Sequence, residues 1–375
     1  MKKVLSFLLS VLIIAGIAAL FYFRPPFATK QIDKVYGMYF VYKGDKEFKK
    51  RHLQKAIDNY NRGLQLYPGH YGAWNNLGSL YVLYEDYFSA VEAYEQAFTH
   101  NPKFMQARMN YGVVSAERLG DFDGAIAQYQ AILDTKPRLI SIPFIFNNRR
   151  STKLNRGLAY YNMGVAYKQK SIYLDDAQEF RRKYLLAALD AYKRAVKILK
   201  KDYAARYNLA LTYHLLDDYH DAGLNYCKAI ELAPMNYDAH YNLAILLRHL
   251  AKADKESARK YYKAALDEMQ KATGLISSSD GFSNRQRYVF DVMNEMTRML
   301  YTDKNSQYFV ERLDDEPQNH GVTYVNGKLV ATDDLDRAIL KNLKTCGSKK
   351  IFTQEITKDY EEPRGRAKVP NIDSF

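Results

Sequence analysis

Residues 73–102, "AWNNLGSLYVLYEDYFSAVEAYEQAFTHNP", decide the fold that we expect for this chain. Gly78 lies in the middle of a segment rich in helix formers, where glycine costs roughly 0.5–1 kcal/mol relative to alanine. Pro102 closes the segment, because proline lacks an amide hydrogen and clashes with the preceding helical turn. A glycine placed at that cost indicates that a second helix, which carries the small Ala90, packs closely against the first.

The pattern around Gly78 recurs along the chain. Gly44, Gly78 and Gly112 are separated by 34 residues each. The whole pattern returns further on, with the polar Arg206 in the place of Trp74. Leu77, Gly78, Tyr81, Ala90, Tyr94, Ala97 and Pro102 then correspond to Leu209, Ala210, Tyr213, Ala222, Tyr226, Ala229 and Pro234.

This pattern resembles the tetratricopeptide repeat, a 34-residue helix–turn–helix unit, whose W-x2-L-G-x2-Y signature is met in full by "WNNLGSLY" at residues 74–81. The resemblance implies an all-α fold, a right-handed superhelical solenoid of about six helix pairs, which is long enough to bury the faces of its repeats. The residues expected to pack or end the paired helices are Trp74, Gly78, Ala90, Pro102, Ala210, Ala222 and Pro234.

The repeats are expected in two runs, three at residues 37–138 and three at 156–272. An insert at 139–155 separates them, and its apolar "PFIF" forms either a plug between repeats three and four or an exposed interaction site. One extra residue is expected in the turn of repeat three. Gly164 and Ala210 are 46 residues apart, 12 more than the period, and we place that addition in the turn of repeat four, around 171–184.

A capping helix is expected at residues 273–301, beginning at Ser283. Its apolar face consists of Val289, Met293, Met296 and Leu300 and is expected to pack on the last repeat. The alternative is that the methionines form a stripe that binds a partner.

Residues 302–375 follow as a C-terminal extension. Asn326-Gly327 indicates a β-hairpin, a short helix is expected at 333–343, and the charged remainder reads as a flexible tail.

The N-terminus indicates a membrane anchor. Residues 1–3 are basic, residues 4–23 carry no charge, and residues 24–36 are expected to be a linker. Twenty helical residues span about 30 Å, the thickness of the hydrocarbon core of a bilayer. A cleaved signal ending near Ala18 is the alternative. Lys2 and Lys3 favour a cytoplasmic N-terminus, which places the chain in the inner (cytoplasmic) membrane by a single pass and the repeats on the periplasmic or extracytoplasmic side.

Composition and charge bound the possible partners. The chain has 375 residues and a formal net charge of +13, and its 47% hydrophobic content excludes wholesale disorder. The charge favours an acidic partner or an anionic surface, with a basic soluble surface as the alternative. Cys227 and Cys346 stand far apart and form no CxxC pattern, so they indicate neither a disulfide framework nor a zinc site and leave the redox compartment undecided.

No catalytic, metal or cofactor motif is found in the sequence. The phosphate-loop, zincin, nucleophile-elbow and dinucleotide fingerprints are all missing. His214 and His220 share a repeat, but six residues apart they do not face one another. Asp217-Asp218 and Asp175-Asp176 fall in expected turns, where acidic residues begin helices. We therefore expect no enzyme activity, no metal and no cofactor.

The resemblance does imply a place for binding. In similar proteins the residue before the Leu-Gly pair lines a concave groove, where side-chain amides bind the backbone of an extended peptide. Here that residue is Asn76, Asn110, Asn162, Asn208 or Asn242, preceded in the last three repeats by Tyr161, Tyr207 or Tyr241. The alternative is that the asparagines only join one repeat to the next. Apolar neighbours such as Val165 and Leu211 argue against a clamp for a terminal carboxylate.

We therefore expect a membrane-anchored scaffold that binds other proteins in its groove and supports the assembly of a bacterial cell-envelope complex, for secretion, pili, flagella or lipopolysaccharide. The alternative is a basic solenoid that binds nucleic acid or an anionic membrane surface. Its Lys and Arg runs, such as "RRK" at 181–183, are dispersed, which disfavours nucleic acid. An enzyme with its site in the C-terminal extension has no motif in its favour.

Overall fold

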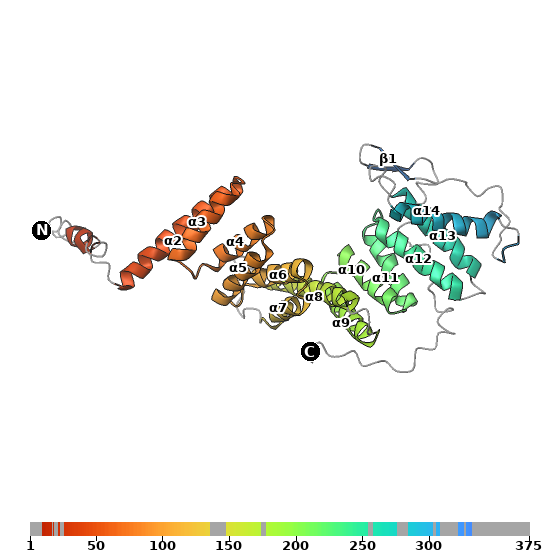
Figure 1. Cartoon of the computed structure of the whole chain (residues 1–375), viewed down its shortest axis with the longest axis horizontal. Helices are drawn as coiled ribbons and strands as arrows, with labels where there is room; N and C mark the ends of the chain where they lie inside the picture. The colour runs from red at the N-terminus through yellow and green to blue at the C-terminus, as the bar shows by residue number, and fades with distance from the viewer. Residues whose placement is uncertain are drawn as a thin grey trace. The chain divides into compact units, whose positions relative to one another are not determined.

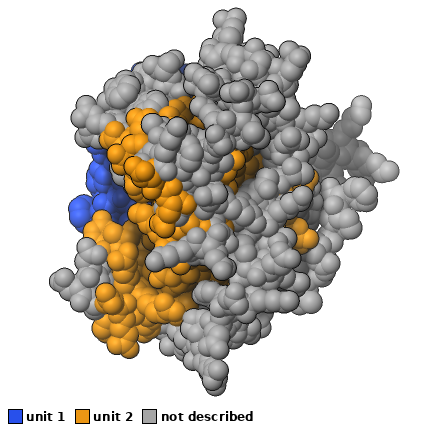
Figure 2. All heavy atoms as spheres, turned by 90° about the vertical axis from the view of Figure 1, so that its right-hand side faces the viewer, with its two compact units in different colours: residues 1–139 blue, residues 140–375 orange. Residues whose placement is uncertain are grey.

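The computed structural model describes residues 10–16, 18, 22, 26–135, 148–173, 178–253, 258–275, 284–302, 305–307, 322–325 and 328–331. The chain divides into two units, residues 1–139 and residues 140–375, which are coloured separately in Figure 2. Both units consist of antiparallel helical hairpins stacked on their neighbours in sequence, as the solenoid interpretation predicts (Figure 1).

Unit 1 contains three hairpins. In each, the second helix returns against the first, and within the unit α3 packs on α4 and α5 packs on α6. The hairpins are α2 (Pro26–Lys49) with α3 (Leu53–Leu66), α4 (Tyr71–Leu83) with α5 (Tyr87–His100), and α6 (Met105–Val114), extended by the π-helical η1 (Ser115–Leu119), with α7 (Phe122–Asp134).

Unit 2 contains three further hairpins, a capping helix and two strands. Its hairpins are α8 (Asn148–Tyr173) with α9 (Gln178–Ile198), α10 (Tyr203–Leu215) with α11 (Tyr219–Leu232), and α12 (Tyr237–Ala253) with α13 (Ala258–Gly274). The capping helix α14 (Asn284–Thr297) continues into η2 (Arg298–Thr302) and packs on α13. Strands β1 (Val322–Val325) and β2 (Lys328–Ala331) pair antiparallel, with Val325 opposite Lys328.

One contact recurs inside the hairpins: a glycine of the first helix faces a buried tyrosine ring of the second. A Cβ atom added to Gly78 would lie 2.8 Å from the ring of Tyr94 and 3.0 Å from the carbonyl oxygen of Ala90. No real Cβ atom approaches another atom so closely, so the close approach expected here is present and requires glycine. The same contact joins Gly44 to Tyr60, Gly112 to Tyr129 and Gly164 to Tyr192.

The position occupied by Trp74 has a polar role that the sequence did not predict. Trp74 Nε1 donates a hydrogen bond to the carbonyl oxygen of Pro68, 2.8 Å away. In later hairpins Arg108 Nε donates to Pro102 (3.2 Å), and His240 Nε2 lies 2.9 Å from the carbonyl oxygen of Pro234. In each case the side chain binds the turn between hairpins six residues earlier. These prolines therefore end a helix and also supply an acceptor that fixes the next one.

Most of the added residues lie in helices. Gly112 and Tyr129 are 17 residues apart, against 16 for Gly78 and Tyr94, and the extra residue is absorbed by the π-helical turn η1. In repeat four α8 ends nine residues after Gly164, whereas α4 ends five after Gly78, and α9 has 21 residues, against 14 in α5. Tyr184 in the lengthened start of α9 stacks on Tyr167 of α8, with ring centroids 6.3 Å apart. Placing all of these additions in turns was wrong.

Two expected boundaries also differ. α2 begins at Pro26, so most of the expected linker 24–36 is helical, and α8 begins at Asn148, inside the expected insert. Cys227 is buried in α11 and disulfide-bonded, which its spacing from the other cysteine did not indicate.

Several expectations fall on residues outside the described ones: most of the apolar segment 4–23, the "PFIF" of the insert, Ser283, Cys346, the short helix at 333–343 and the tail. They stay predictions, as does the handedness of the superhelix. Within the described part of the chain, no helix combines the length and the apolar character needed to cross a membrane.

The turn inside a hairpin contains a residue in the left-handed region. Its φ is 61° at Arg51, 60° at Glu85, 69° at Gly120 and 63° at Asp217. The following residue begins the second helix, and three of these are aspartates that accept a hydrogen bond from the backbone N–H three residues on. The acceptors are Asp86 (3.1 Å), Asp121 (2.9 Å) and Asp218 (3.2 Å), so the expected role of Asp218 as a helix start is confirmed.

We predict that Gly78→Ala lowers the free energy of unfolding of unit 1 by about 1–3 kcal/mol, because the added methyl group overlaps Tyr94 and the backbone of Ala90. Gly72→Ala in the same helix is the matched control. Its methyl group would meet His70 at an ordinary 3.5 Å, so it should leave stability unchanged or raise it slightly. Equal effects of the two changes in urea unfolding would contradict the packing role of Gly78.

We predict opposite effects at two left-handed turn positions. Glu85→Gly should raise the stability of unit 1 by about 1 kcal/mol, because glycine adopts positive φ without the clash of a Cβ atom. Gly120→Ala should lower it by a similar amount, since no atom lies within 4 Å of the added methyl group and only the backbone is strained. Thermal unfolding followed by circular dichroism checks both signs.

Candidate protein-binding face

The predicted groove asparagines lie half-buried on the first helices of their hairpins. In unit 2 two of them bind a tyrosine of the preceding hairpin. Asn208 Nδ2 on α10 donates to the hydroxyl of Tyr161 on α8 (3.4 Å), and Asn242 Nδ2 on α12 donates to the hydroxyl of Tyr207 on α10 (2.8 Å). We call the surface built by α8, α10 and α12 around these side chains the first-helix face of unit 2.

Unit 1 contains the same kind of contact with other acceptors. Asn76 Nδ2 donates to Asp45 Oδ1 (3.2 Å) and to the hydroxyl of Tyr60 (3.4 Å). Asn110 Nδ2 donates to the side-chain oxygen of Asn75, 3.0 Å away. Four of the asparagines, Asn76, Asn110, Asn208 and Asn242, therefore do join one hairpin to the next, which is the alternative role that the sequence left open. Whether they also bind a peptide stays a prediction.

The predicted tyrosines are held by ring contacts on the same face. Tyr207 stacks on Tyr203 one helical turn earlier, with centroids 5.7 Å apart and an angle of 15° between the rings. Tyr241 stacks on Tyr237 in the same way, at 5.5 Å and 18°. Tyr161 lies against the buried Tyr192, with centroids 6.0 Å apart. Because Tyr161, Tyr207 and Tyr241 are half-buried and held by these rings, they would lose little conformational entropy if a ligand bound to them.

Lys168 is a residue of this face that the sequence reasoning missed. Its Nζ donates to Asn208 Oδ1 at 2.6 Å. Burial lowers the pKa of Lys168, and no carboxylate of the described residues offsets that loss of hydration. A partly desolvated ammonium group without a counter-charge attracts an anionic group of a ligand. One feature of the sequence could have indicated it: Lys168 stands four residues after Gly164, which places it one helical turn further along the same side of α8.

A second cluster joins hairpins five and six. The ring centroids of His214 and His249 lie 5.6 Å apart, and the Nδ1 atom of His214 lies 3.4 Å from the hydroxyl of Tyr226. Burial, and next the charge of His249, lower the pKa of His214 to about 4, against the opposing effect of Asp217. His220 Nδ1 lies 3.6 Å from Asp221 Oδ1.

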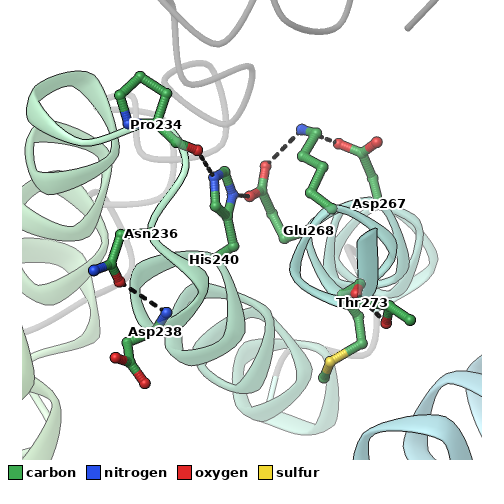
Figure 3. A network of polar contacts seen from close by, with 9 residues as sticks. Pro234, Asn236, Asp238, His240, Asp267, Glu268 and Thr273 are labelled. Carbon is green, nitrogen blue, oxygen red and sulfur yellow. Dashed lines mark hydrogen bonds and ion pairs between the residues drawn. The ribbon is translucent and has the colours of Figure 1, made fainter. Parts of the chain in front are cut away.

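A buried ionic network holds the last hairpin together (Figure 3). His240 Nδ1 lies 2.7 Å from Glu268 Oε2, and Lys271 Nζ lies 2.8 Å from the other oxygen of that carboxylate and 2.6 Å from Asp267 Oδ2. Burial alone would raise the pKa of Glu268, but the charge of Lys271 and the hydrogen bond with His240 hold it well below its usual range. The network is closed on itself and serves the packing of α13 on α12.

None of the residues that the structure describes forms a group of three or more His, Cys, Asp or Glu side chains suited to a metal ion. The chemistry of the first-helix face is that of hydrogen bonds, aromatic contact and one cation, which suits binding.

Comparison with known protein families agrees with the hairpin periodicity. Residues 85–139 and 203–236 each match a family described as "Tetratricopeptide repeat". These matches cover the helices α5, α6 and α7 and the hairpin of α10 with α11, so the chain contains tetratricopeptide repeats, as the resemblance implied.

Two curated proteins are similar to the chain. The BBSome complex member BBS4 of Bos taurus is 25% identical over 241 residues, which is 64% of this chain and 39% of that protein. The tetratricopeptide repeat-containing protein trd-1 of Caenorhabditis elegans is 29% identical over 91 residues, 24% of this chain and 12% of that protein. The chain therefore spans well under half the length of both relatives.

Among solved structures, PilW, described as a type IV pilus biogenesis factor, aligns with a TM-score of 0.46 and 16% identity, covering 68% of this chain and 98% of that one. The PilF protein of Pseudomonas aeruginosa aligns with a TM-score of 0.44 and 14% identity, covering 62% and 90%.

We predict that the stability of unit 2 falls as the pH is lowered from about 6.5 to about 4. His214 stays neutral in the folded protein but gains a proton in the unfolded chain over this window, so the unfolded state binds more protons and stability rises with pH. The slope contributed by one such group reaches at most about 1.4 kcal/mol per pH unit.

His214→Gln should flatten the pH dependence of urea unfolding, whereas the exposed His100→Gln should leave it unchanged. Loss of stability that begins only below about pH 4.5, where the unfolded chain protonates Glu268 while the folded protein keeps it ionised, would contradict the role of His214.

Proposed function

We propose that the tetratricopeptide repeats of this chain form a scaffold that holds an extended segment of another protein on the first-helix face of unit 2. The bound segment would contact the tyrosine rings through its side chains and the amides of Asn162, Asn208 and Asn242 through its backbone. We also propose that a carboxylate of the segment lies near Lys168.

The observation that carries this proposal is the desolvated cation of Lys168 beside Asn208 and Tyr161. Asn242 and Tyr207 join two hairpins through a neutral contact of 2.8 Å, whereas the contact of Lys168 with Asn208 carries a positive charge. Burial of a lysine for which the described residues supply no counter-charge costs stability, and a polypeptide partner that supplies a carboxylate would recover that cost. Fixed aromatic rings and side-chain amides on the same face suit a polypeptide more than a small ion.

A tether and an assembly role complete the proposal. The uncharged segment 4–23 is long enough to anchor the chain in the inner (cytoplasmic) membrane, with the repeats outside the cytoplasm. There the scaffold would gather components of a bacterial cell-envelope complex. The relative BBS4 is named as a member of a protein complex, which agrees with a role in assembly without identifying this complex.

The experiment is affinity capture of the full chain, extracted from membranes, in three forms beside the native protein. Asn208→Ala/Asn242→Ala and Lys168→Gln change the first-helix face, whereas Lys197→Ala/Lys228→Ala changes exposed lysines of the second helices α9 and α11. Circular dichroism first checks that each variant is folded, since the asparagines also join hairpins.

The proposal predicts that a partner held by the native chain binds at least about 10-fold more weakly to Lys168→Gln, because a hydrogen bond to a charged group is lost. The asparagine variant should lose the same partner and the second-helix variant should keep it. Partners retained by both face variants and lost from Lys197→Ala/Lys228→Ala would move the binding site to the second helices.

A further inference from the structure

The first hairpin exposes the surface that later hairpins bury. Tyr39, Lys43 and Lys46 lie 34 residues before Ala73, Leu77 and Leu80, which are buried against α3 in the core of unit 1. In α2 the corresponding side chains are exposed, and Tyr39 retains 50% of its accessible surface. A hairpin or a second copy stacked on α2 in the usual way would bury Lys43 and Lys46, at a large desolvation cost.

This outer face of α2 combines apolar and cationic side chains. The acidic residues of α2, Asp33, Asp45 and Glu47, are half-buried and do not belong to this exposed face. Asp45 Oδ1 accepts a hydrogen bond from the hydroxyl of Tyr60 (2.6 Å), and Glu47 Oε1 lies 2.9 Å from Lys50 Nζ. The outer face itself consists of Val35 (61% exposed), Met38 (43%), Tyr39 (50%), Tyr42 (65%), Lys43, Lys46 and Lys49.

The outer face continues into a shallow groove of ≈ 540 Å³ between α2 and α3. Lys43 and Lys46 on α2 face Lys55 and Arg62 on α3 across it, and the two carboxylates of the lining belong to Glu47 and Asp58. Lys43 Nζ lies 4.9 Å from the centroid of the Tyr39 ring, so cation and aromatic ring act at one place. Four cations against two carboxylates favour an anionic ligand in the groove.

We infer that the outer face of α2 lies on an anionic lipid surface, with lipid phosphates in the groove and Val35, Met38 and the tyrosines among the headgroups. Lysine side chains lay their stems along apolar surface and keep their ammonium groups among the headgroups, and clustered lysines are attracted to anionic lipids. The position in the chain agrees, because α2 begins at Pro26, directly after the uncharged segment 4–23. A nucleic acid would use the lysines but has no place for Val35 and Met38.

The inference deepens the proposed tether: the anchor would fix the distance of the repeats from the bilayer, and α2 would fix their orientation. It rests on that tether, so the experiment must separate the two. Leu12→Arg/Ile14→Arg places two charges in the apolar segment and prevents its insertion. Any binding to vesicles that this background retains comes from other parts of the chain.

The experiment is flotation of the full-length protein with vesicles of phosphatidylcholine alone or with about 30 mol% phosphatidylserine. The Leu12→Arg/Ile14→Arg background should float only with the anionic vesicles and should be released by about 0.5 M NaCl, because salt screens the lysines. Adding Lys43→Glu/Lys46→Glu/Lys49→Glu should lower the partition coefficient at least about 100-fold. Tyr39→Ser/Tyr42→Ser, which keeps every charge, should lower it less.

The matched control is Lys103→Glu/Lys200→Glu/Lys201→Glu, which makes the same change in net charge at exposed residues outside α2 and should leave flotation intact. Equal losses from both triple variants would show attraction by net charge alone and overturn the inference. So would binding of the background to a DNA duplex through the α2 lysines without flotation. If the native protein does not float with neutral vesicles, the proposed membrane anchor at residues 4–23 is wrong. The binding of α2 to anionic vesicles is measured in the Leu12→Arg/Ile14→Arg background and does not depend on that result.

Discussion

The structure depends on one packing constraint, the contact of a glycine in the first helix of a hairpin with a buried tyrosine ring in the second. Four pairs make it, from Gly44 and Tyr60 to Gly164 and Tyr192. Glycine costs helix stability at each place, and the burial of an aromatic ring more than offsets that cost. The contact sets the distance between the paired helices of these four hairpins, and the small Ala210 takes the place of the glycine in the fifth. The stack follows from repetition of this one geometry.

That repetition also builds the first-helix face. Equivalent positions on successive first helices lie beside one another, so an asparagine of one hairpin reaches a tyrosine of the hairpin before it, as Asn242 reaches Tyr207. The same side chains then hold the hairpins together and remain half-buried at the surface. Lys168 departs from this pattern, because it brings a partly buried positive charge to the contact with Asn208, and it is therefore the residue on which the proposed binding role rests.

The period of 34 residues and the positions of the glycines were enough to predict the hairpins, because a glycine in the middle of a helix indicates that a second helix packs closely against it. The 12 extra residues of repeat four could not be placed from the sequence, because they fit equally well into a long turn or into two longer helices. The stacking of Tyr167 on Tyr184 in the structure shows that the helices are longer. The asparagines were placed on the correct helices, but their contacts could not be predicted, because an amide binds a peptide or a tyrosine hydroxyl equally well. Lys168 was missed because its burial depends on helices distant in sequence.

The central claim, that the first helices of unit 2 bind a polypeptide, is tested most directly by hydrogen exchange of the full chain with and without a captured partner. Exchange reports the protection of backbone amides helix by helix. The account predicts added protection in α8, α10 and α12, greatest near Lys168 and Asn208, with α9, α11 and α13 unchanged. Protection confined to the second helices would contradict it.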